Sequence, residues 1–287
     1  MDRRIIELYD EYTHKPLERR VFLRRLAALT GSTAAAFALL PTLDNNYAQA
    51  AIVDPGDARV AAGMINYPGA SGALRAYLAA PTSGPAKRAG VIVIHANRGL
   101  DPHIEDVARR FAVAGFTAMA PDLLSPLGGT PADVDTARSL FQRVDRVVAL
   151  RDLVAAVPFL KGRPDSNGKV GAVGFCWGGG MTNLLAANAP DLAAAVPFYG
   201  NTLSPEEAAN IKAPLMLHYA GNDARINAGV PSFEAALKAA GVPYELYTYD
   251  NVEHAFHDDT AGARYNKAAA ELAWSRTIAF LKKNLAG

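Results

Sequence analysis

The only cysteine of the chain, Cys176, lies in the stretch GFCWGG. Gly174 and Gly178 flank it in the pattern Gly-x-nucleophile-x-Gly, after an apolar strand and at the start of a helix. On so sharp a turn the nucleophile is strained, and side chains at the flanking positions would hold strand and helix apart. The helix N-terminus favours a thiolate, and the N–H of Trp177 would point at a developing oxyanion. The pattern predicts a cysteine nucleophile; the alternative is a buried structural cysteine.

A thiol nucleophile needs a base, and the base needs a carboxylate that orients it. With this turn, the expected order along the chain is nucleophile, acid, histidine. Asp223 in HYAGNDARI and His254 in YDNVEHAFHDD each follow an expected strand, so they are the candidate acid and base. An aspartate in a turn after a strand is also common without any catalytic role. Of the other histidines, His257 beside two aspartates is expected to be solvated, His95 to be a packing residue, and His14 to belong to a leader.

Apolar runs alternate with helical patterns from residue 59 onward. Two alternating runs within 59–80 predict an antiparallel edge hairpin, and the continuous run AGVIVIH at 89–95 predicts a buried parallel strand. A long helical pattern spans 131–160, and an amphipathic helix is expected at 262–285. The rhythm predicts an α/β fold with a doubly wound, mostly parallel sheet and helices on both faces. Reactive loops of such sheets lie beyond the carboxyl ends of the strands, where the three candidate residues fall.

Composition limits the classes of partner. The 287 residues carry a formal net charge of +1, with 50% hydrophobic and 20% charged residues, as in an ordinary globular protein. No long block of like charge follows the first 25 residues, which argues against nucleic acid or an anionic membrane surface as the main partner. One cysteine excludes an intramolecular disulfide and a multi-cysteine metal site. No sequence feature indicates an oligomeric state.

The first 50 residues read differently from the rest. Paired arginines at 19–20 precede a mildly apolar run at 26–40, and the segment ends in Ala48-Gln49-Ala50. A basic region, a short apolar run and an A-x-A end predict a secretory leader, and the paired arginines favour the twin-arginine route. The run is shorter than the roughly 20 residues that cross a bilayer as a helix.

This pattern predicts two parts of the chain. Residues 1–50 form a leader that is cleaved near Ala50, and residues 51–287 form one α/β domain that is exported, to the periplasm. The alternative is an N-terminal amphipathic helix or a retained anchor.

Taken together, these motifs resemble the dienelactone hydrolase family of α/β-hydrolases, over about residues 60–285. The resemblance rests on GFCWGG, AGNDARI, EHAF and the PDLL that follows the second parallel strand. It implies hydrolysis of lactones and related carboxylic esters through an acyl thioester, without a metal or cofactor. It also implies that Cys176 is the nucleophile, that His254 is the general base and then the acid, and that Asp223 fixes the His254 tautomer.

The resemblance further implies oxyanion donors, the backbone N–H groups of Trp177 and of Ala96 or Asn97. Family members usually carry a glutamate where the loop HANRG has Ala96. Alanine neither ionises nor accepts a hydrogen bond from the thiol. Either His254 alone activates Cys176, or the chain acts on an ester other than the family's usual dienelactone.

Substrate contacts are less specific. Arg98 in the same loop is a candidate partner for a substrate carboxylate, and Tyr199 is a candidate for the wall of an acyl pocket; both residue types are equally common in structural roles. The expected partner is a small-molecule ester or lactone. Two other functions stay open, a non-catalytic small-molecule binding protein and an esterase of another substrate class.

Overall fold

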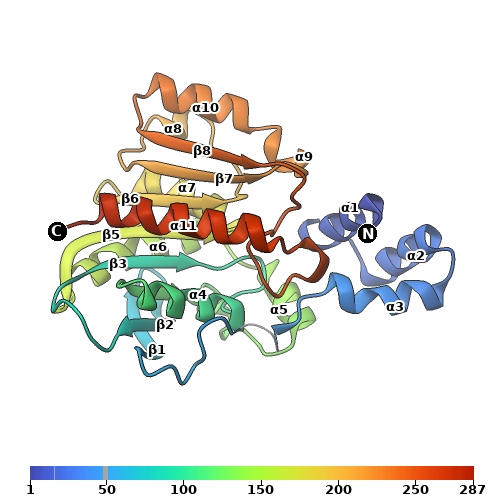
Figure 1. The fold of residues 1–287 in the computed structure, drawn as a ribbon, viewed down its shortest axis with the longest axis horizontal. Coiled ribbons are helices and arrows are strands. Elements are labelled where there is room, and N and C mark those ends of the chain that lie inside the picture. The colour runs from blue at the N-terminus through green and yellow to red at the C-terminus, as the bar shows by residue number, and fades with distance from the viewer. Residues whose placement is uncertain (16, 48–50) are drawn as a thin grey trace.

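A single mixed sheet organises the computed structural model, which describes residues 1–15, 17–47 and 51–287 (Figure 1). In the described residues the sheet has eight strands in the order β1-β2-β4-β3-β5-β6-β7-β8. Strands β1 and β2 form an antiparallel hairpin at one edge, β2 pairs antiparallel with β4, and all remaining pairs are parallel. The bounds are β1 (Val60–Gly69), β2 (Gly72–Pro81), β3 (Arg88–Ile94), β4 (Thr117–Pro121), β5 (Ser166–Phe175), β6 (Ala194–Phe198), β7 (Leu215–Ala220) and β8 (Tyr244–Tyr249).

Helices cover both faces of the sheet, as the sequence predicts. The helices after β3 are α4 (Pro102–Val113), α5 (Val134–Phe141), α6 (Arg146–Lys161), α7 (Trp177–Asn188), α8 (Pro205–Ala208), α9 (Ala224–Asn227), α10 (Val230–Ala239) and α11 (Lys267–Asn284), with short 3-10 turns η2 (Ser125–Leu127) and η3 (Gly262–Arg264). Helices α6, α7 and α10 pack on one face and α4 and α11 on the other. The mostly parallel α/β prediction and the edge hairpin are therefore confirmed.

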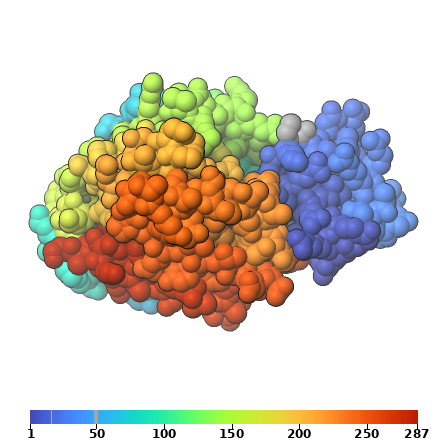
Figure 2. All heavy atoms as spheres, turned by 90° about the horizontal axis from the view of Figure 1, so that it is seen from above, coloured from blue at the N-terminus to red at the C-terminus, as the bar shows by residue number. Residues whose placement is uncertain are grey.

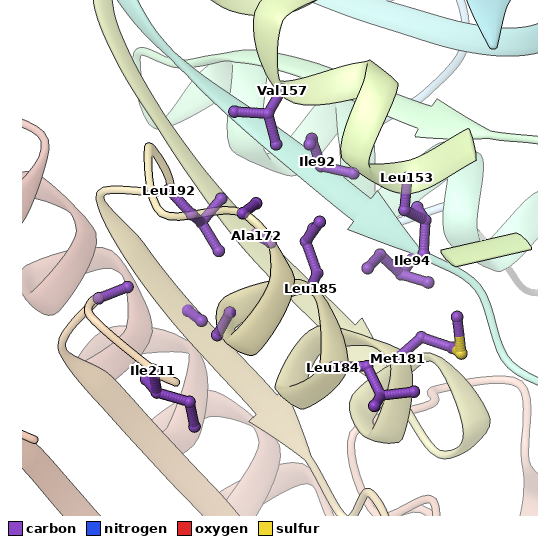
Figure 3. Close-up of a cluster of buried hydrophobic side chains, with 14 of the residues drawn as sticks. Ile92, Ile94, Leu153, Val157, Ala172, Met181, Leu184, Leu185, Leu192 and Ile211 are labelled. Carbon is purple, nitrogen blue, oxygen red and sulfur yellow. The ribbon is translucent and has the colours of Figure 1, made fainter. Parts of the chain in front are cut away.

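Strand β3 shows how the sequence supplies both cores. Val91 and Val93 point to the face covered by α4 and α11, while Ile92 and Ile94 point to the face covered by α6 and α7. Figure 3 shows the second core, with Ile92 and Ile94 close to Leu153 of α6. Because both faces are buried, the strand has no polar alternation and reads as one continuous apolar run.

One predicted element is divided in the structure. The helical pattern at 131–160 forms two helices, α5 and α6, rather than one. Asp145 ends the interruption because its carboxylate accepts hydrogen bonds from the backbone N–H groups of Val147 (2.8 Å) and Val148 (3.2 Å), which starts a new helix. The closing helix is shorter than predicted for a related reason, since the side chain of Asn266 caps α11 at Ala269.

The N-terminal segment folds into three helices, α1 (Arg3–His14), α2 (Arg19–Thr30) and α3 (Thr33–Leu43), at one end of the sheet (Figures 1 and 2, blue). They share a small apolar core that includes Tyr9, Phe22 and Leu43. Gly31 ends α2 in a left-handed conformation (φ 83°), and α3 leaves at 109° to α2. Among the described residues no single helix is long and apolar enough to cross a membrane, and only the bent pair α2–α3 reaches that length and composition together.

These helices neither establish nor exclude the predicted leader. The paired arginines begin α2; Arg19 binds Asp135 (2.7 Å) and Arg20 binds Glu18 (2.6 Å), both at the surface. The predicted cleavage motif Ala48-Gln49-Ala50 lies outside the described residues. Cleavage and export remain predictions.

Candidate active site

Cys176 occupies the turn between β5 and α7 in a conformation that L-residues rarely adopt, with φ 57° and ψ −115°. Its N–H donates to the carbonyl of Phe198 on the neighbouring strand (3.0 Å), which ties the turn to the sheet. The flanking glycines are required by space. A Cβ at Gly174 would collide with the carbonyl oxygen of Gly178, and a Cβ at Gly178 would collide with the carbonyl of Ile94. The crossing of strand and helix therefore holds the sulfur at a strained corner, as predicted.

Asp223 and His254 meet at the carboxyl ends of the adjacent strands β7 and β8. Asp223 caps α9, accepting from the N–H of Ile226 through Oδ1 (3.3 Å), while its Oδ2 lies 2.5 Å from Nδ1 of His254. With Nδ1–H donated to the carboxylate, Nε2 is the free ring nitrogen. That atom is buried and has no hydrogen-bond partner among the described residues, and a ring nitrogen of His254 lies within 4.8 Å of the Cys176 sulfur.

The charges around Cys176 favour an ion pair between its sulfur and the neighbouring imidazole rings. Burial by itself would raise the pKa of the Cys176 thiol, but the imidazoles of His14 and then His254 outweigh it and hold that pKa well below its usual value. Burial would lower the pKa of His254, yet the sulfur of Cys176 and the carboxylate of Asp223 raise it to about 10. The arrangement therefore favours thiolate and imidazolium over thiol and imidazole.

Sequence reasoning missed His14. Its Nε2 lies 3.0 Å from the sulfur of Cys176, and its ring stands 4.9 Å from that of His254 at an interplanar angle of 81°. Nδ1 of His14 is 2.9 Å from the main-chain oxygen of Asp10 and 3.0 Å from its carboxylate. The available signal was the Asp10–His14 spacing of four, which places both groups on one helix face. Nothing in the spacing links that face to a residue 162 positions away.

A pocket of about 570 Å³ opens beside the sulfur. Its walls come from α1, the loop after β3, α5, the Cys176 turn, and the loops after β6, β7 and β8, with the lining residues Thr13, His14, Lys15, Asn97, Arg138, Phe141, Gln142, Cys176, Trp177, Tyr199, Asn201, Arg225, Ile226 and His254. Trp177 and Tyr199 thus both reach the pocket, and the Tyr199 ring packs 4.9 Å from that of His254. The size suits a small molecule.

The loop after β3 is bound to the N-terminal helix. The Asn97 side-chain amide donates to the carbonyl of Thr13 (2.6 Å), which leaves only its backbone N–H as a candidate oxyanion donor. Arg98 is buried and donates to the hydroxyl of Tyr9 (2.8 Å). It does not line the 570 Å³ pocket, but it lines a cavity of about 40 Å³ that also touches Ala96, Cys176 and His254, and a separate pocket of about 330 Å³.

Two other histidines are structural. His95 is buried, with Nδ1 donating to the carbonyl of Ala96 (2.7 Å) and Nε2 accepting from the N–H of Leu123 (3.2 Å), which confirms it as a packing residue. The prediction that His257 is solvated is wrong. His257 is 1% exposed and stacks on Phe175 at 5.0 Å, and burial holds its pKa well below the usual value. The turn after β8 places it toward the core rather than beside solvent, which the adjacent aspartates do not reveal.

The donor atoms of His14, Cys176 and His254 lie within 4.8 Å of one another. Because Nε2 of His14 lies within hydrogen-bond distance of the sulfur and Nδ1 of His254 faces the carboxylate of Asp223, we interpret the cluster as a hydrogen-bonded group.

The sequence of this chain is similar to that of known hydrolases. The model of the "Dienelactone hydrolase family" matches residues 74–285. A protein of Methylorubrum extorquens assigned as a carboxymethylenebutenolidase is 33% identical over 281 residues, covering 91% of this chain and 94% of its own, an extent that reaches into residues 1–50. A protein of Escherichia coli K12 with the same assignment is 32% identical over 246 residues, covering 81% and 90%.

Solved structures give the same result. The crystal structure of a Klebsiella pneumoniae protein assigned as a dienelactone hydrolase superposes with a TM-score of 0.70 at 29% identity, covering 78% of this chain and 99% of that one. A family match over most of the sheet, relatives above 30% identity and a shared fold lead to one conclusion: the chain belongs to the dienelactone hydrolase family and is a hydrolase.

Proposed function

We propose that this hydrolase cleaves lactones or related carboxylic esters through an acyl thioester on Cys176. The observation that supports the proposal most is the strained turn that presents the sulfur within 4.8 Å of a buried imidazole whose other nitrogen is held at 2.5 Å by Asp223. A nucleophile, a base and an orienting carboxylate in this arrangement are the requirements of acyl transfer. The relatives assigned as carboxymethylenebutenolidases support an ester or lactone as substrate.

In the first half-reaction the thiolate of Cys176 attacks the ester carbonyl carbon. The carbonyl oxygen becomes an oxyanion, and we assign its binding to the backbone N–H groups of Trp177 and of Ala96 or Asn97; such donors supply ~3–4 kcal/mol of transition-state stabilisation. When the C–O bond breaks, Nε2–H of His254 gives its proton to the leaving alkoxide. In a lactone the alcohol stays attached to the acyl group.

In the second half-reaction water hydrolyses the thioester. Neutral His254 takes a proton from water through Nε2, and the resulting hydroxide attacks the acyl carbon. Collapse of the tetrahedral intermediate breaks the C–S bond, releases the acid and restores thiolate and imidazolium. Asp223 stays ionised throughout and stabilises the charged ring, because the hydrogen bond to His254 keeps its pKa low against the opposing effect of burial.

The test is a panel of lactones and of aryl and alkyl esters with wild type, Cys176→Ala and Cys176→Ser. We expect Cys176→Ala to abolish turnover with an unchanged melting temperature, and Cys176→Ser to keep a trace. Rapid quenching and intact mass measurement should reveal an acyl adduct on wild type alone. Near-normal turnover by Cys176→Ala would exclude the mechanism. Saturable ligand binding without turnover by wild type would favour a binding protein instead.

Export is a separate proposal. It is supported by the paired arginines at the surface of α2 and by the A-x-A motif at 48–50. Cell fractionation, together with the N-terminal sequence of the recovered protein, tests both the compartment and the cleavage site. Recovery in the cytoplasm would argue against it.

A further inference from the structure

The sulfur of Cys176 has two imidazole neighbours, and one of them comes from the N-terminal helix. Nε2 of His14 is 3.0 Å from the sulfur, within hydrogen-bond distance, whereas Nε2 of His254 has no hydrogen-bond partner among the described residues. Each ring holds a carboxylate through Nδ1, Asp10 for His14 and Asp223 for His254. Two imidazole–carboxylate pairs therefore converge on one sulfur.

Polar contacts hold α1 in this position. The hydroxyl of Tyr9 accepts from Arg98 (2.8 Å) and the carbonyl of Thr13 accepts from Asn97 (2.6 Å), both on the loop after β3. From α5, Arg138 donates to the carbonyl of Tyr12 (3.2 Å) and lies 3.9 Å above the centre of its ring.

A further contact comes from the α9 side of the pocket. Arg225 lies 3.3 Å from the carboxylate of Asp10, on the oxygen that does not face His14. The carboxylate that orients His14 is thus itself fixed by the sheet domain.

We propose that His14 is a further catalytic residue. Its imidazolium ring, oriented by Asp10, is the counter-ion of the Cys176 thiolate whenever the sulfur is not acylated. His254 is then free to give and take the proton of the two ester half-reactions. This assignment rests on the proposed function, since it names the group that stabilises the nucleophile of that reaction. Ala96, on the loop where family members usually carry an acid, brings no ionisable group to the sulfur.

Protons and electrons balance in this scheme. In the resting enzyme the thiol proton lies on Nε2 of His14, which donates it as a hydrogen bond to the thiolate. The sulfur lone pair forms the C–S bond, and the leaving alkoxide takes its proton from His254. Water then gives a proton to His254 as its oxygen bonds to the acyl carbon, and the C–S bond breaks when the tetrahedral intermediate collapses. His14 keeps its proton throughout and meets the thiolate again when it is released.

The charges around His14 are consistent with an imidazolium. It faces Asp10 from its own helix, Cys176 from the turn before α7 and His254 from the loop after β8; the charged residues of the adjoining small cavity are Arg98, Asp101, Asp258 and Arg264. Burial by itself would lower the pKa of His14, but the sulfur of Cys176 and the carboxylate of Asp10 outweigh it and raise the pKa, against repulsion from His254.

Helix α1 forms one wall of the pocket beside Cys176 and does not fill the pocket. Thr13, His14 and Lys15 line one side of the 570 Å³ cavity, and Cys176 and His254 line it as well. A small ester therefore reaches the sulfur with α1 in place. It follows that the active enzyme retains residues 1–15, so this proposal and removal of the segment near Ala50 exclude each other.

The experiment measures the alkylation rate of the single thiol by iodoacetamide against pH in the full-length chain, which reports the thiolate without requiring ester turnover. In His14→Gln the midpoint should rise by about one pH unit or more, so that the rate at pH 6 falls about tenfold or more while the rate at high pH is unchanged. Arg3→Gln is the matched control, because the Arg3 side chain is exposed on α1 and pairs with Glu7 of the same helix (3.0 Å). Circular dichroism checks that both variants fold.

Asp10→Asn provides a second variant that keeps the ring, and its midpoint should move in the same direction by less. An unchanged midpoint in a folded His14→Gln variant would overturn the assignment. So would a gain in ester turnover, which would identify α1 as a plug, or an active enzyme whose mass shows that it begins after residue 50. If instead Cys176→Ala retains turnover, the proposed function fails, and the alkylation profile still shows whether His14 holds the thiolate.

Discussion

The two imidazole–carboxylate pairs beside Cys176 are built in different ways. Asp223 and His254 come from loops at the ends of adjacent parallel strands, within the family match at 74–285. Asp10 and His14 come from one turn of a single helix outside that match. The side chains of the first pair are 3% and 6% exposed, and those of the second are 22% and 14% exposed. A sheet fixes its pair through the backbone, whereas the helix pair depends on how well α1 docks.

The largest expected difference in activity lies between variants of His254 and variants of His14. In the proposed mechanism His254 transfers protons in both half-reactions, so His254→Gln should lower kcat by ~10³–10⁴. His14 is proposed to act only as the counter-ion, so His14→Gln should lower kcat/KM at neutral pH by ~10–100-fold, and most of this loss should be recovered at high pH. Steady-state hydrolysis of one aryl ester by both variants makes the comparison. Equal losses at all pH values would mean that the two rings share one role.

Loss of the Asp223 carboxylate should likewise lower activity more than loss of the Asp10 carboxylate. Asp223→Asn leaves His254 with a weaker partner and a less certain tautomer, and should lower kcat by ~10²–10³. Asp10→Asn should cost less than about tenfold, because a more exposed pair is better screened by solvent. The ratio of kcat for these two variants tests whether exposure governs the contribution. A larger loss for Asp10→Asn would reverse the comparison.

Glycines test the rigidity of the two regions. Gly178→Ala forces a Cβ into the carbonyls of Ile94 and His95, so the free energy of unfolding should fall by ~3 kcal/mol or more. At Gly31, between α2 and α3, an added Cβ meets nothing within 4 Å. Gly31→Ala should therefore lower the free energy of unfolding by only ~1 kcal/mol, because the backbone there is left-handed. Urea unfolding followed by circular dichroism measures both. Similar costs would show that the Cys176 turn relaxes more easily than its packing indicates.

The activity profile should reflect the raised pKa of His254. Its proton is held until the pH passes about 10 and is lost above it, so kcat/KM should decline about tenfold per pH unit there as the general acid disappears. On the acid side activity should persist well below the usual cysteine pKa, because the thiolate survives. A pH–rate profile with a neutral ester, checked for alkaline unfolding, provides the measurement. A decline that begins near pH 7 would contradict the ion pair.

The smallest effect should come from one contact of the helix. Tyr9→Phe removes the hydroxyl that accepts from Arg98 and donates to Asp44 (2.8 Å), and the loss of the Arg98 contact should weaken docking of α1 by ~1 kcal/mol. Hydrogen exchange of residues 3–14 should rise several-fold, with that of β5 unchanged. Faster exchange across the sheet as well would show that α1 and the sheet unfold as one unit.

The contrast between a sheet-built pair and a helix-borne pair also explains which site residues could be predicted from the sequence. Parallel strands bring their carboxyl ends to one edge, so Cys176, Asp223 and His254 were identifiable from motif and order alone, and the glycines around the cysteine gave the turn. The position of α1 depends on side-chain contacts with loops far along the chain, which no local pattern encodes. His257 was misjudged for a similar reason, since its burial depends on how the loop after β8 folds back over β5 and β6.

Helix α1 precedes Cys176 in the chain, whereas the loop that carries His254 follows it by almost 80 residues. While the chain is being made, the thiol of residue 176 is synthesised before Asp223 and His254. In the proposed reaction, the thiol is therefore a competent nucleophile only after the loop that follows β8 has folded against it. A chain interrupted before residue 223 would hold Cys176 without the base and the carboxylate that the reaction requires.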